Sequence, residues 1–266
     1  VTYLPVDEFG LIDLEQLKSA ITEKTVLISI MFANNEIGTI QNVSQIGAIA
    51  HEHNVLFHTD AAQAVGHIPI DVKKMNIDLM SFSSHKIYGP KGIGALYLRS
   101  LMPRVKLNSI VYGGGQERNI RSGTLNVPGI VGFAKAVEIA VAEMNDENKK
   151  YKKWTDIMLE KFAAVGGKLN GHPTNRLVHN LNVRFEGIES KAIINSVSKK
   201  IAISAGSACS SGKVKSSQAL NAMGYDDITA SSAVRISLGP STTEHEVMNF
   251  VDAWSKAYKK YAVKTA

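Results

Sequence analysis

Residues 78–92 of the chain read DLMSFSSHKIYGPKG, and this segment decides which fold we expect. It opens with an apolar run typical of a buried strand, turns polar, and ends in a Gly-Pro-Lys-Gly chain breaker. Lys86 follows the strand directly, which is where open α/β sheets bind their ligands. A surface lysine in a loop is the ordinary alternative. Ser83 and His85 flank Lys86 as hydrogen-bond donors, and this local pattern favours a binding site.

Apolar strands and helices alternate through the first half of the chain. We expect strands at 25–32, 55–60, 79–83 and 94–98, and helices at 14–21 and 43–52. The strands are apolar enough to be buried on both faces, which favours a mostly parallel sheet.

The chain also opens on a stretch with strand character, Val1-Thr2-Tyr3-Leu4-Pro5, and no initiator methionine precedes it. We therefore expect the sequence to be the C-terminal portion of a longer polypeptide, because a domain of this class needs more chain on its N-terminal side.

The second half of the chain reads as a smaller α+β domain. A helical pattern starts at Val127, and the charged stretch 145–153 carries it onward to Phe162. The expected domain boundary lies inside this pattern and separates residues 1–143 from residues 144–266. Beyond the boundary we expect strands at 179–185, 201–204 and 233–238, and a helix at 190–197. The last helix begins at the capping box Thr243 and Glu246, and its apolar stripe is Val247, Phe250, Val251, Trp254 and Tyr258.

Composition places the chain among ordinary globular proteins. It has 266 residues, of which 44% are hydrophobic and 20% charged. No apolar run approaches the roughly 18 residues of a membrane span, and no signal peptide is visible. The single cysteine excludes an intrachain disulfide framework and leaves a buried thiol or a reactive one.

The net charge of +6 comes with two clusters of lysine. Solvated helix faces are the favoured interpretation, and a docking surface for an acidic partner is the alternative. No nucleic-acid motif accompanies the charge. The clusters are Lys149, Lys150, Lys152 and Lys153, and Lys256, Lys259 and Lys260.

The segment SFSSHKIYGPKG resembles the lysine segment of group I cysteine desulfurases, the NifS- and IscS-like enzymes that use pyridoxal 5'-phosphate (PLP). The resemblance implies the PLP-dependent transferase fold type I of aminotransferase class V. It also implies that Lys86 forms the Schiff base with the cofactor, whose own chemistry carries the reaction. By the same resemblance, residues 1–143 are a PLP-binding domain that lacks its N-terminal part, and residues 144–266 carry the loop with the catalytic cysteine.

Two further strand ends carry candidate cofactor residues. Asp60 ends the expected strand 55–60, where it is either an acid facing the same edge as Lys86 or a helix N-cap. Its segment resembles the family's Asp-x-x-Gln pattern, which implies Asp60 on the pyridine nitrogen and Gln63 on the ring hydroxyl. An acid at that nitrogen keeps it protonated and makes the ring an electron sink. Asn35 is an ordinary turn residue by itself, but its motif resembles the family's active-site asparagine, which contacts cofactor and substrate carboxylate.

The phosphate of PLP requires several donors at once. The resemblance assigns Ser83 and His85 to it. The Gly-rich stretch 113–118 and the Arg-Ser-Gly-Thr at 121–124 look like a backbone nest with two arginines. In the family, the threonine that matches Thr124 reaches the phosphate of the neighbouring subunit, which implies a homodimer.

Cys209 lies among small residues in the stretch SAGSACSSGK at 204–213, a poor context for a buried cysteine. The stretch resembles the family's mobile loop, whose thiolate takes sulfur from the substrate, so Cys209 is the expected nucleophile and persulfide carrier. Arg235 is a charge inside an expected apolar strand and needs a partner. A structural salt bridge is one possibility, and the resemblance implies a bidentate clamp on the substrate carboxylate.

Three functions remain open from the sequence. The first is a cysteine desulfurase that converts L-cysteine to L-alanine and supplies sulfur, through a scaffold protein or another acceptor, for iron–sulfur clusters and thio-cofactors. The second is another enzyme of the same fold type, such as a selenocysteine lyase or an aminotransferase, although Cys209 argues against the latter. The third is a sulfur-relay or scaffold subunit without turnover. The resemblance implies the cytoplasm, or the mitochondrial matrix in a eukaryote, with no nucleic-acid, membrane or metal partner.

Overall fold

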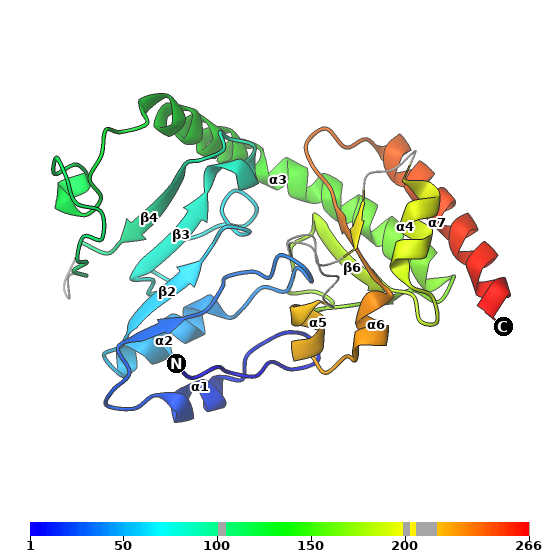
Figure 1. Ribbon diagram of the computed structural model, residues 1–266, viewed down its shortest axis with the longest axis horizontal. Coiled ribbons are helices and arrows are strands. Elements are labelled where there is room, and N and C mark those ends of the chain that lie inside the picture. Colours follow the sequence, from blue (N-terminus) through cyan, green and yellow to red (C-terminus); the bar gives the residue numbers. More distant parts are fainter. Residues whose placement is uncertain (101–104, 199–202, 206–216, 266) are drawn as a thin grey trace. The chain divides into compact units, whose positions relative to one another are not determined.

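The computed structural model describes residues 1–100, 105–198, 203–205 and 217–265 (Figure 1). These residues form two compact units. The mixed-sheet unit contains Ile21–Phe32 and Asn42–Met144. The antiparallel-sheet unit contains Val1–Ala20, Ala33–Gln41 and Asn145–Ala266.

The mixed-sheet unit is built on four strands in sequential order. The strands are β1 (Leu27–Ser29), β2 (Leu56–Asp60), β3 (Leu79–Ser83) and β4 (Gly94–Leu98). Pairs β1–β2 and β2–β3 are parallel, and only β4 runs antiparallel to its neighbour. Helix α2 (Val43–Glu52) connects β1 to β2. The expected mostly parallel α/β sheet is confirmed.

The two faces of this sheet differ sharply in burial, whereas the sequence predicted burial on both. Ile28, Phe57 and Met80 share one face and are at most 7% exposed. On the opposite face Leu27 and Leu96 are 45% and 48% exposed. Strand hydrophobicity alone does not reveal which layers cover a sheet, because a one-sided strand can also be mostly apolar.

The first residues of the chain do not form the expected strand. Val1–Pro5 have no regular structure, and only Val6 forms an isolated bridge, with Ile12. A turn joins these two residues, in which the side chain of Asp7 accepts hydrogen bonds from two backbone amides. An apolar run becomes a strand only where a neighbouring strand pairs with it, and the described chain supplies none for Val1–Pro5.

The antiparallel-sheet unit holds a second four-stranded sheet of order β5-β6-β8-β7. Its strands are β5 (Lys168–Leu169), β6 (Asn180–Arg184), β7 (Ser204–Ala205) and β8 (Ala233–Ser237). Helices α4 (Ser190–Val197) and α7 (Glu244–Thr265) belong to this unit, and α3 (Val127–Ala163) contributes its C-terminal half. Short helices α5 (Gln218–Ala222) and α6 (Asp227–Ser231) were not predicted. The antiparallel sheet with its helices confirms the expected α+β character.

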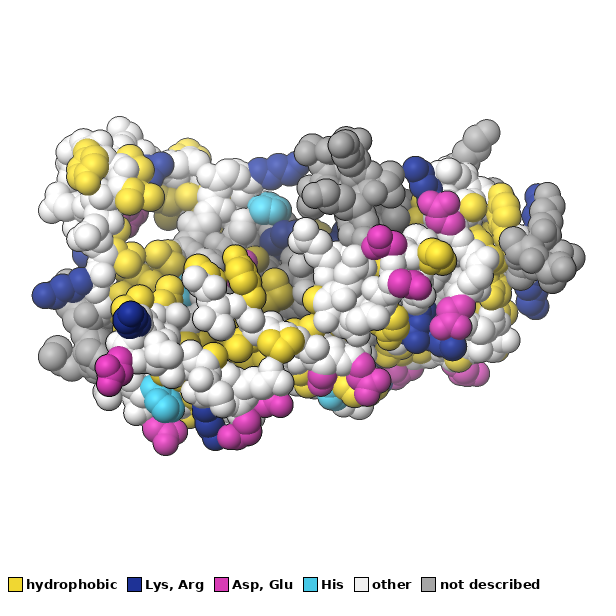
Figure 2. Space-filling model, turned by 60° about the horizontal axis from the view of Figure 1, so that its bottom comes forward, with side chains coloured by type: hydrophobic (Ala, Val, Ile, Leu, Met, Phe, Trp, Pro, Cys, Tyr) yellow, Lys and Arg dark blue, Asp and Glu magenta, His cyan; other side chains and the backbone are white. Residues whose placement is uncertain are grey.

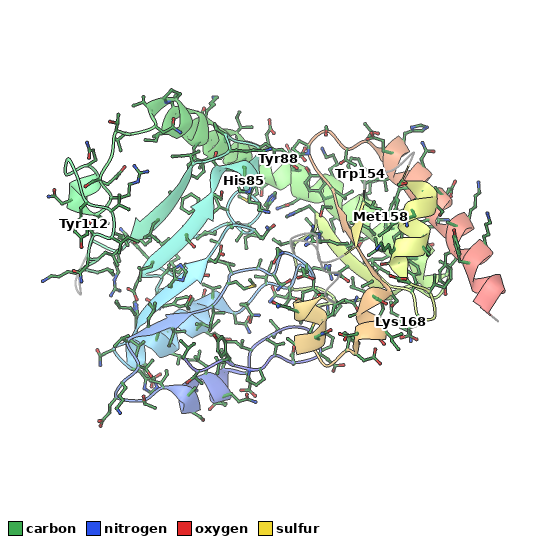
Figure 3. All side chains as sticks on the ribbon, in the orientation of Figure 1. His85, Tyr88, Tyr112, Trp154, Met158 and Lys168 are labelled. Atoms are coloured by element: carbon green, nitrogen blue, oxygen red, sulfur yellow. The ribbon has the colours of Figure 1, made fainter. Side chains whose placement is uncertain are left out.

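An aromatic cluster forms the core of this unit. Phe185 lies 5.3 Å from Trp254 and 5.6 Å from Phe162 between ring centroids, and all three side chains are fully buried. Trp154 and Met158 of α3 belong to the same cluster, as Figure 3 shows beside β6. Such aromatic contacts stabilise a core beyond the area that they bury.

The last helix begins as expected. Glu246 Oε2 accepts a hydrogen bond from the backbone amide of Thr243, and Thr243 Oγ1 accepts one from the amide of Glu246. This reciprocal pair is the predicted capping box. Four of the five predicted stripe residues are buried, and Tyr258 packs partly buried against them.

The two compact units do not match the expected domains, residues 1–143 and 144–266, because one unit combines three separate segments of the chain. The units do separate between Met144 and Asn145, but Val1–Ala20 and Ala33–Gln41 group with the C-terminal residues. Long-range hydrogen bonds explain the grouping of Ala33–Gln41: Thr39 Oγ1 accepts from the amide of His172, and Asn175 Nδ2 donates to the carbonyl of Ile40. Val1–Ala20 joins them because Gln41 Nε2 donates to the carbonyl of Gly10. The assignment of functions to the two domains stays a prediction.

The first lysine cluster is paired with carboxylates. Lys149 and Lys150 pair with Asp146 and Glu147 one helical turn earlier. Lys152 pairs with Asp156, and Lys153 with Glu244 of α7. On the face shown in Figure 2, basic and acidic side chains are interspersed. These pairs favour an ordinary charged helix face for this cluster. No helix in the described part of the chain is long and apolar enough to cross a membrane.

A buried carboxylate stabilises the mixed-sheet unit at the start of β3. Asp78 is fully buried; its Oδ2 accepts from the backbone amide of Phe57 at 2.8 Å, and its Oδ1 lies 2.7 Å from Arg99 Nε. His51 Nε2 lies 3.1 Å from Oδ2. Asp78 therefore joins the end of α2, strand β2 and the residue after β4.

Replacing Asp78 by alanine is expected to lower the free energy of unfolding by about 3 kcal/mol, because the half-buried charge of Arg99 loses its partner. Urea unfolding of the complete protein at pH 7 measures the change. Asp146→Ala is the matched control: its ion pair with Lys149 is exposed on both sides, and such surface pairs contribute little to stability. A loss equal to that of the control would contradict the structural role of Asp78.

Candidate active site

Lys86 lies on a tight turn directly after β3. The 3-10 turn η1 spans Ser84–Ile87, and Tyr88 ends it in the left-handed conformation, with φ of 64°. The backbone amide of Gly89 donates to the carbonyl of Ser84 at 3.0 Å. Lys86 is exposed while Ile87 is buried, so the turn presents the amine and anchors its apolar neighbour. Figure 3 shows His85 and Tyr88 on this turn at the end of β3.

Gly89 is required by the packing of this turn. A Cβ atom at Gly89 would lie 2.2 Å from Ser84 Oγ and 2.9 Å from Ala136 Cβ of α3. Both distances are shorter than any ordinary contact, and the neighbours are packed against other residues. The glycine therefore fixes the position of the turn that carries Lys86.

Gly89→Ala is expected to destabilise the protein by about 1–3 kcal/mol through overpacking. It should also weaken PLP binding, since the turn must shift away from β3. Adding Ser84→Ala removes the hydroxyl from the clash and should restore part of the lost stability. Thermal unfolding and a PLP titration measure the two effects, and unchanged values in Gly89→Ala would show that the turn tolerates the side chain.

Asp60 lies at the carboxyl end of β2, next to β3. It is the register partner of Ser81, and the amide of Ala61 donates to the carbonyl of Ser81 at 2.8 Å. Its Oδ1 accepts a hydrogen bond from the amide of Ala62 at 2.9 Å. No helix begins there, because the following residues form turns. The carboxylate thus caps a turn, and its exposed side remains accessible for a ligand.

Ser83 and His85, the two predicted phosphate ligands, lie in contact with each other. Ser83 Oγ lies 2.8 Å from His85 Nδ1, and the imidazole is exposed. One of the two donates to the other in this contact, which leaves either the serine hydroxyl or the imidazole Nε2–H free to donate to an anion. Residue alternation places Ser83, Ser81 and Asp60 on one face of the sheet.

Two histidines that the sequence did not single out support this edge. Burial lowers the pKa of His67, while a hydrogen bond to the backbone of Lys86 opposes that shift. His67 thereby braces the turn that carries Lys86. A lone histidine in a turn-rich stretch gave no signal for this role.

His58 links three strands beneath the candidate site. Its Nδ1 lies 2.8 Å from Ser29 Oγ on β1, and its Nε2 lies 3.3 Å from Ser81 Oγ on β3. Burial lowers the pKa of His58, and the nearby charge of Asp60 partly opposes this. In the sequence, His58 and Asp60 alternate with the buried residues Phe57 and Thr59, and this alternation could have indicated a polar face on the strand.

Two predicted cofactor residues of this unit, Gln63 and Thr124, have no hydrogen bond to Ser83 or His85 within the described residues. Gln63 is half-buried in the turn after β2. Thr124 is exposed. Tyr112, which precedes Thr124 in the chain, lies well away from His85 in Figure 3. The arrangement is compatible with the predicted role of Thr124 at a neighbouring subunit, which stays a prediction.

Asn35 lies in the antiparallel-sheet unit, on a turn that side chains of β6 and β8 hold. Its carbonyl accepts from Asn180 Nδ2 at 3.2 Å and from Arg235 Nη1 at 3.4 Å. Asn182 Nδ2 donates to the carbonyl of Glu36. The side chain of Asn35 is exposed, whereas its backbone is fixed.

A buried cation completes this support. Arg176 donates to the carbonyls of Ile37 and Asn180 through Nη2, and to those of Asn170 and His172 through Nη1. Burial lowers the pKa of Arg176 to about 10, so it remains charged at neutral pH. The sequence gave no signal for it, since its partners are backbone atoms from distant segments.

Arg235 projects from β8 and is partly buried, in contact with the backbone of Asn35. The two predicted substrate-binding residues therefore lie together within one unit. Cys209 lies outside the described residues, and its predicted role stays a prediction.

The residues at the ends of β2 and β3 fit PLP. They offer a carboxylate for a ring nitrogen, a hydroxyl and imidazole pair for a phosphate, and an exposed amine for an aldehyde. These are Asp60, Ser83, His85 and Lys86, all within one unit. No group of acidic, histidine or cysteine side chains that could hold a metal ion occurs in the described ranges.

The fold is that of the PLP-dependent transferases, and this donor set would suit that cofactor. The chain belongs to the aminotransferase class-V family, whose model matches residues 1–250, and enzymes of this family depend on PLP.

Among curated proteins, the chain is 49% identical over 249 residues to "Cysteine desulfurase IscS" of Methanosarcina thermophila, covering 93% of this chain and 61% of that protein. It is 47% identical to "Cysteine desulfurase, mitochondrial" of Arabidopsis thaliana, covering 98% of this chain and 57% of that protein. The chain thus spans about three fifths of the length of these relatives.

Solved structures show the same likeness. A "NIFS-LIKE PROTEIN" is similar with a TM-score of 0.88 and 38% identity, covering 97% of this chain and 68% of the other. A structure titled "SspA in complex with cysteine" has a TM-score of 0.76 and 39% identity, covering 91% and 67%. These similarities confirm the predicted family and fold type.

Proposed function

We propose that the complete protein is a PLP-dependent cysteine desulfurase. The observation that carries the proposal is the donor set of Asp60, Ser83, His85 and Lys86 at the ends of two paired strands. Its support comes from relatives at nearly half identity that are named cysteine desulfurases. The substrate would be L-cysteine and the products L-alanine and a persulfide on Cys209.

Each residue of this edge has a proposed task. Bound PLP supplies an electron sink for the substrate. Asp60 holds a proton at the pyridine nitrogen, Gln63 donates to the ring hydroxyl, and Ser83 and His85 bind the phosphate. Lys86 holds the cofactor between turnovers and moves a proton at the substrate Cα.

Asn35 and Arg235 would bind the substrate. The guanidinium of Arg235 is proposed to hold the substrate carboxylate in a bidentate pair, and the amide of Asn35 to donate to cofactor and carboxylate. A hydrogen bond from Arg235 Nη1 to the backbone carbonyl of Asn35 holds the arginine side chain against the backbone that carries the Asn35 amide before substrate arrives.

The sulfur transfer is assigned to Cys209. Its thiolate attacks the substrate sulfur, a sulfur–sulfur bond forms, and the carbon–sulfur bond of the substrate breaks. The bonding electrons remain on carbon, which takes up a proton and leaves as alanine. The sulfur of Cys209 ends as a persulfide, so no outside oxidant is needed.

The decisive experiment is incubation of the complete protein with L-cysteine and a thiol reductant, with alanine and sulfide measured together. Equal amounts of the two products are expected. An aminotransferase would instead consume a keto acid and release no sulfide, and a relay subunit would release neither product.

The partners are proposals of the same kind. We infer a homodimer, with Thr124 of one subunit at the phosphate of the other, and an iron–sulfur scaffold or another sulfur acceptor as the next partner. The cytoplasm, or the mitochondrial matrix in a eukaryote, is the proposed compartment. One relative carries the word mitochondrial in its name.

A further inference from the structure

The side chains of Glu36 and Ser217 join two motifs that lie far apart in the sequence. Ser217 Oγ donates a hydrogen bond to Glu36 Oε2 at 2.5 Å, within the antiparallel-sheet unit. Glu36 directly follows Asn35. Ser217 is the first described residue after the segment 206–216, which contains Cys209.

Ser217 is a fixed point of the fold. It is only 4% exposed, and its Oγ also accepts a hydrogen bond from the amide of Leu220 at 3.1 Å. It is therefore the N-cap of α5 as well as the partner of Glu36. Because the bond to Glu36 has an ionisable acceptor, it is among the stronger hydrogen bonds that a serine can form.

An apolar contact region reinforces this link. Ile37, the residue after Glu36, and Leu220 of α5 are each 1% exposed and belong to one buried cluster. The other members of that cluster are Met223, Ala230 and Ala233. The turn that carries Asn35 and the start of α5 are thus joined by a polar bond and by a small core.

The turn itself is held from its other side. The carbonyls of Asn35, Glu36 and Ile37 accept hydrogen bonds from Asn180, Asn182 and Arg176 respectively. Glu36 therefore presents its carboxylate from a backbone that cannot easily shift. A rigid acceptor makes Ser217, and hence the start of α5, rigid in turn.

We propose that Glu36 and Ser217 are positioning residues for sulfur transfer, an inference that rests on the proposed function. Their bond fixes Ser217, the residue that follows the segment with Cys209, relative to Asn35, which is proposed to bind cofactor and substrate. Neither side chain is assigned a contact with the reacting sulfur atoms. The pair acts only on the step in which the Cys209 thiolate bonds to the substrate sulfur and the carbon–sulfur bond breaks.

The test is a double-mutant cycle in the complete protein with PLP bound. Persulfide formation on Cys209 is measured in a single turnover by alkylation and mass spectrometry. Glu36→Ala and Ser217→Ala should each slow that step about tenfold, and the double variant should be no slower than either single one. PLP affinity, from absorbance, and the KM for cysteine should stay within about twofold of wild type.

Two conservative variants and one control accompany the cycle. Ser217→Thr and Glu36→Gln keep a donor and an acceptor, and are expected to retain near wild-type rates. Ser190→Ala removes another buried serine hydroxyl of the same unit, which donates to the carbonyl of Ser231, and should leave the persulfide rate unchanged. If the alanine variants fail to fold, Ser217→Gly decides, because glycine is tolerated at a helix N-cap but cannot bond to Glu36: its persulfide rate should fall about tenfold, and a wild-type rate would overturn the inference.

Several results would overturn the inference. Additive losses in the double variant would mean that the two side chains act separately. A fall in PLP affinity equal to the fall in persulfide rate would assign them a merely structural role. A wild-type protein that makes no alanine would overturn the proposed function and this inference together, whereas normal alanine production with unaffected variants overturns only the inference.

Discussion

Replacing Lys86 by alanine is expected to abolish cysteine turnover in the complete protein, lowering kcat by roughly a thousandfold or more. The visible absorbance of covalently held PLP should disappear as well. The reason is local: Lys86 carries the exposed amine on the turn after β3, beside the donor pair of Ser83 and His85. Absorbance spectra and alanine release measure the two effects.

Lys91→Ala is the matched control for this variant. Lys91 is an exposed lysine of the same segment, beyond the end of the turn. It should keep both the absorbance and the turnover. A Lys86→Ala protein that releases alanine at the wild-type rate would contradict the assignment of Lys86, whatever the control does.

Elements with strong local patterns were predicted to the residue. Helix α2 (Val43–Glu52), strands β3 and β4, and helix α4 (Ser190–Val197) have the expected bounds. In each, apolar periodicity and flanking turn residues point to the same structure. Strand β1 (Leu27–Ser29) is shorter than its apolar run, although the amides of Ile30 and Phe32 still donate to the carbonyls of His58 and Asp60 on β2.

What the sequence could not reveal depends on contacts between distant segments. Residues 33–41 group with the C-terminal unit because backbone carbonyls there meet Arg176, Asn180 and Asn182. Side chains that bind the backbone leave no pattern in a single sequence. The same holds for His67, whose partner is the backbone of Lys86.

In the candidate site, too, some residues could be predicted from the sequence and others could not. The residues expected to touch the cofactor come from specific motifs, and the structure places Asp60, Ser83 and His85 at paired strand ends; their contact with the cofactor stays a prediction. The residues that hold them were not recognised. His58 on β2 contacts Ser29 on β1 and Ser81 on β3. These residues are far apart in the sequence and become neighbours only through the register of the sheet.

Replacing Cys209 by serine is expected to separate the two halves of the reaction. The variant should bind PLP as tightly as the wild type, because Asp60, Ser83, His85 and Lys86 are unchanged. It should also bind cysteine, since Asn35 and Arg235 remain. It should form no persulfide, and sulfide release should fall by roughly a hundredfold or more, because a serine hydroxyl is a far weaker nucleophile than a thiolate.

The informative comparison is with Lys86→Ala, which should lose both halves at once. Absorbance changes on adding cysteine report substrate capture, and mass spectrometry of residue 209 reports sulfur transfer. Capture without transfer in Cys209→Ser would place the thiol after the cofactor in the reaction sequence. Wild-type desulfuration by Cys209→Ser would make the cysteine merely structural and favour an enzyme of this family that needs no thiol, since this cysteine is the chain's single one.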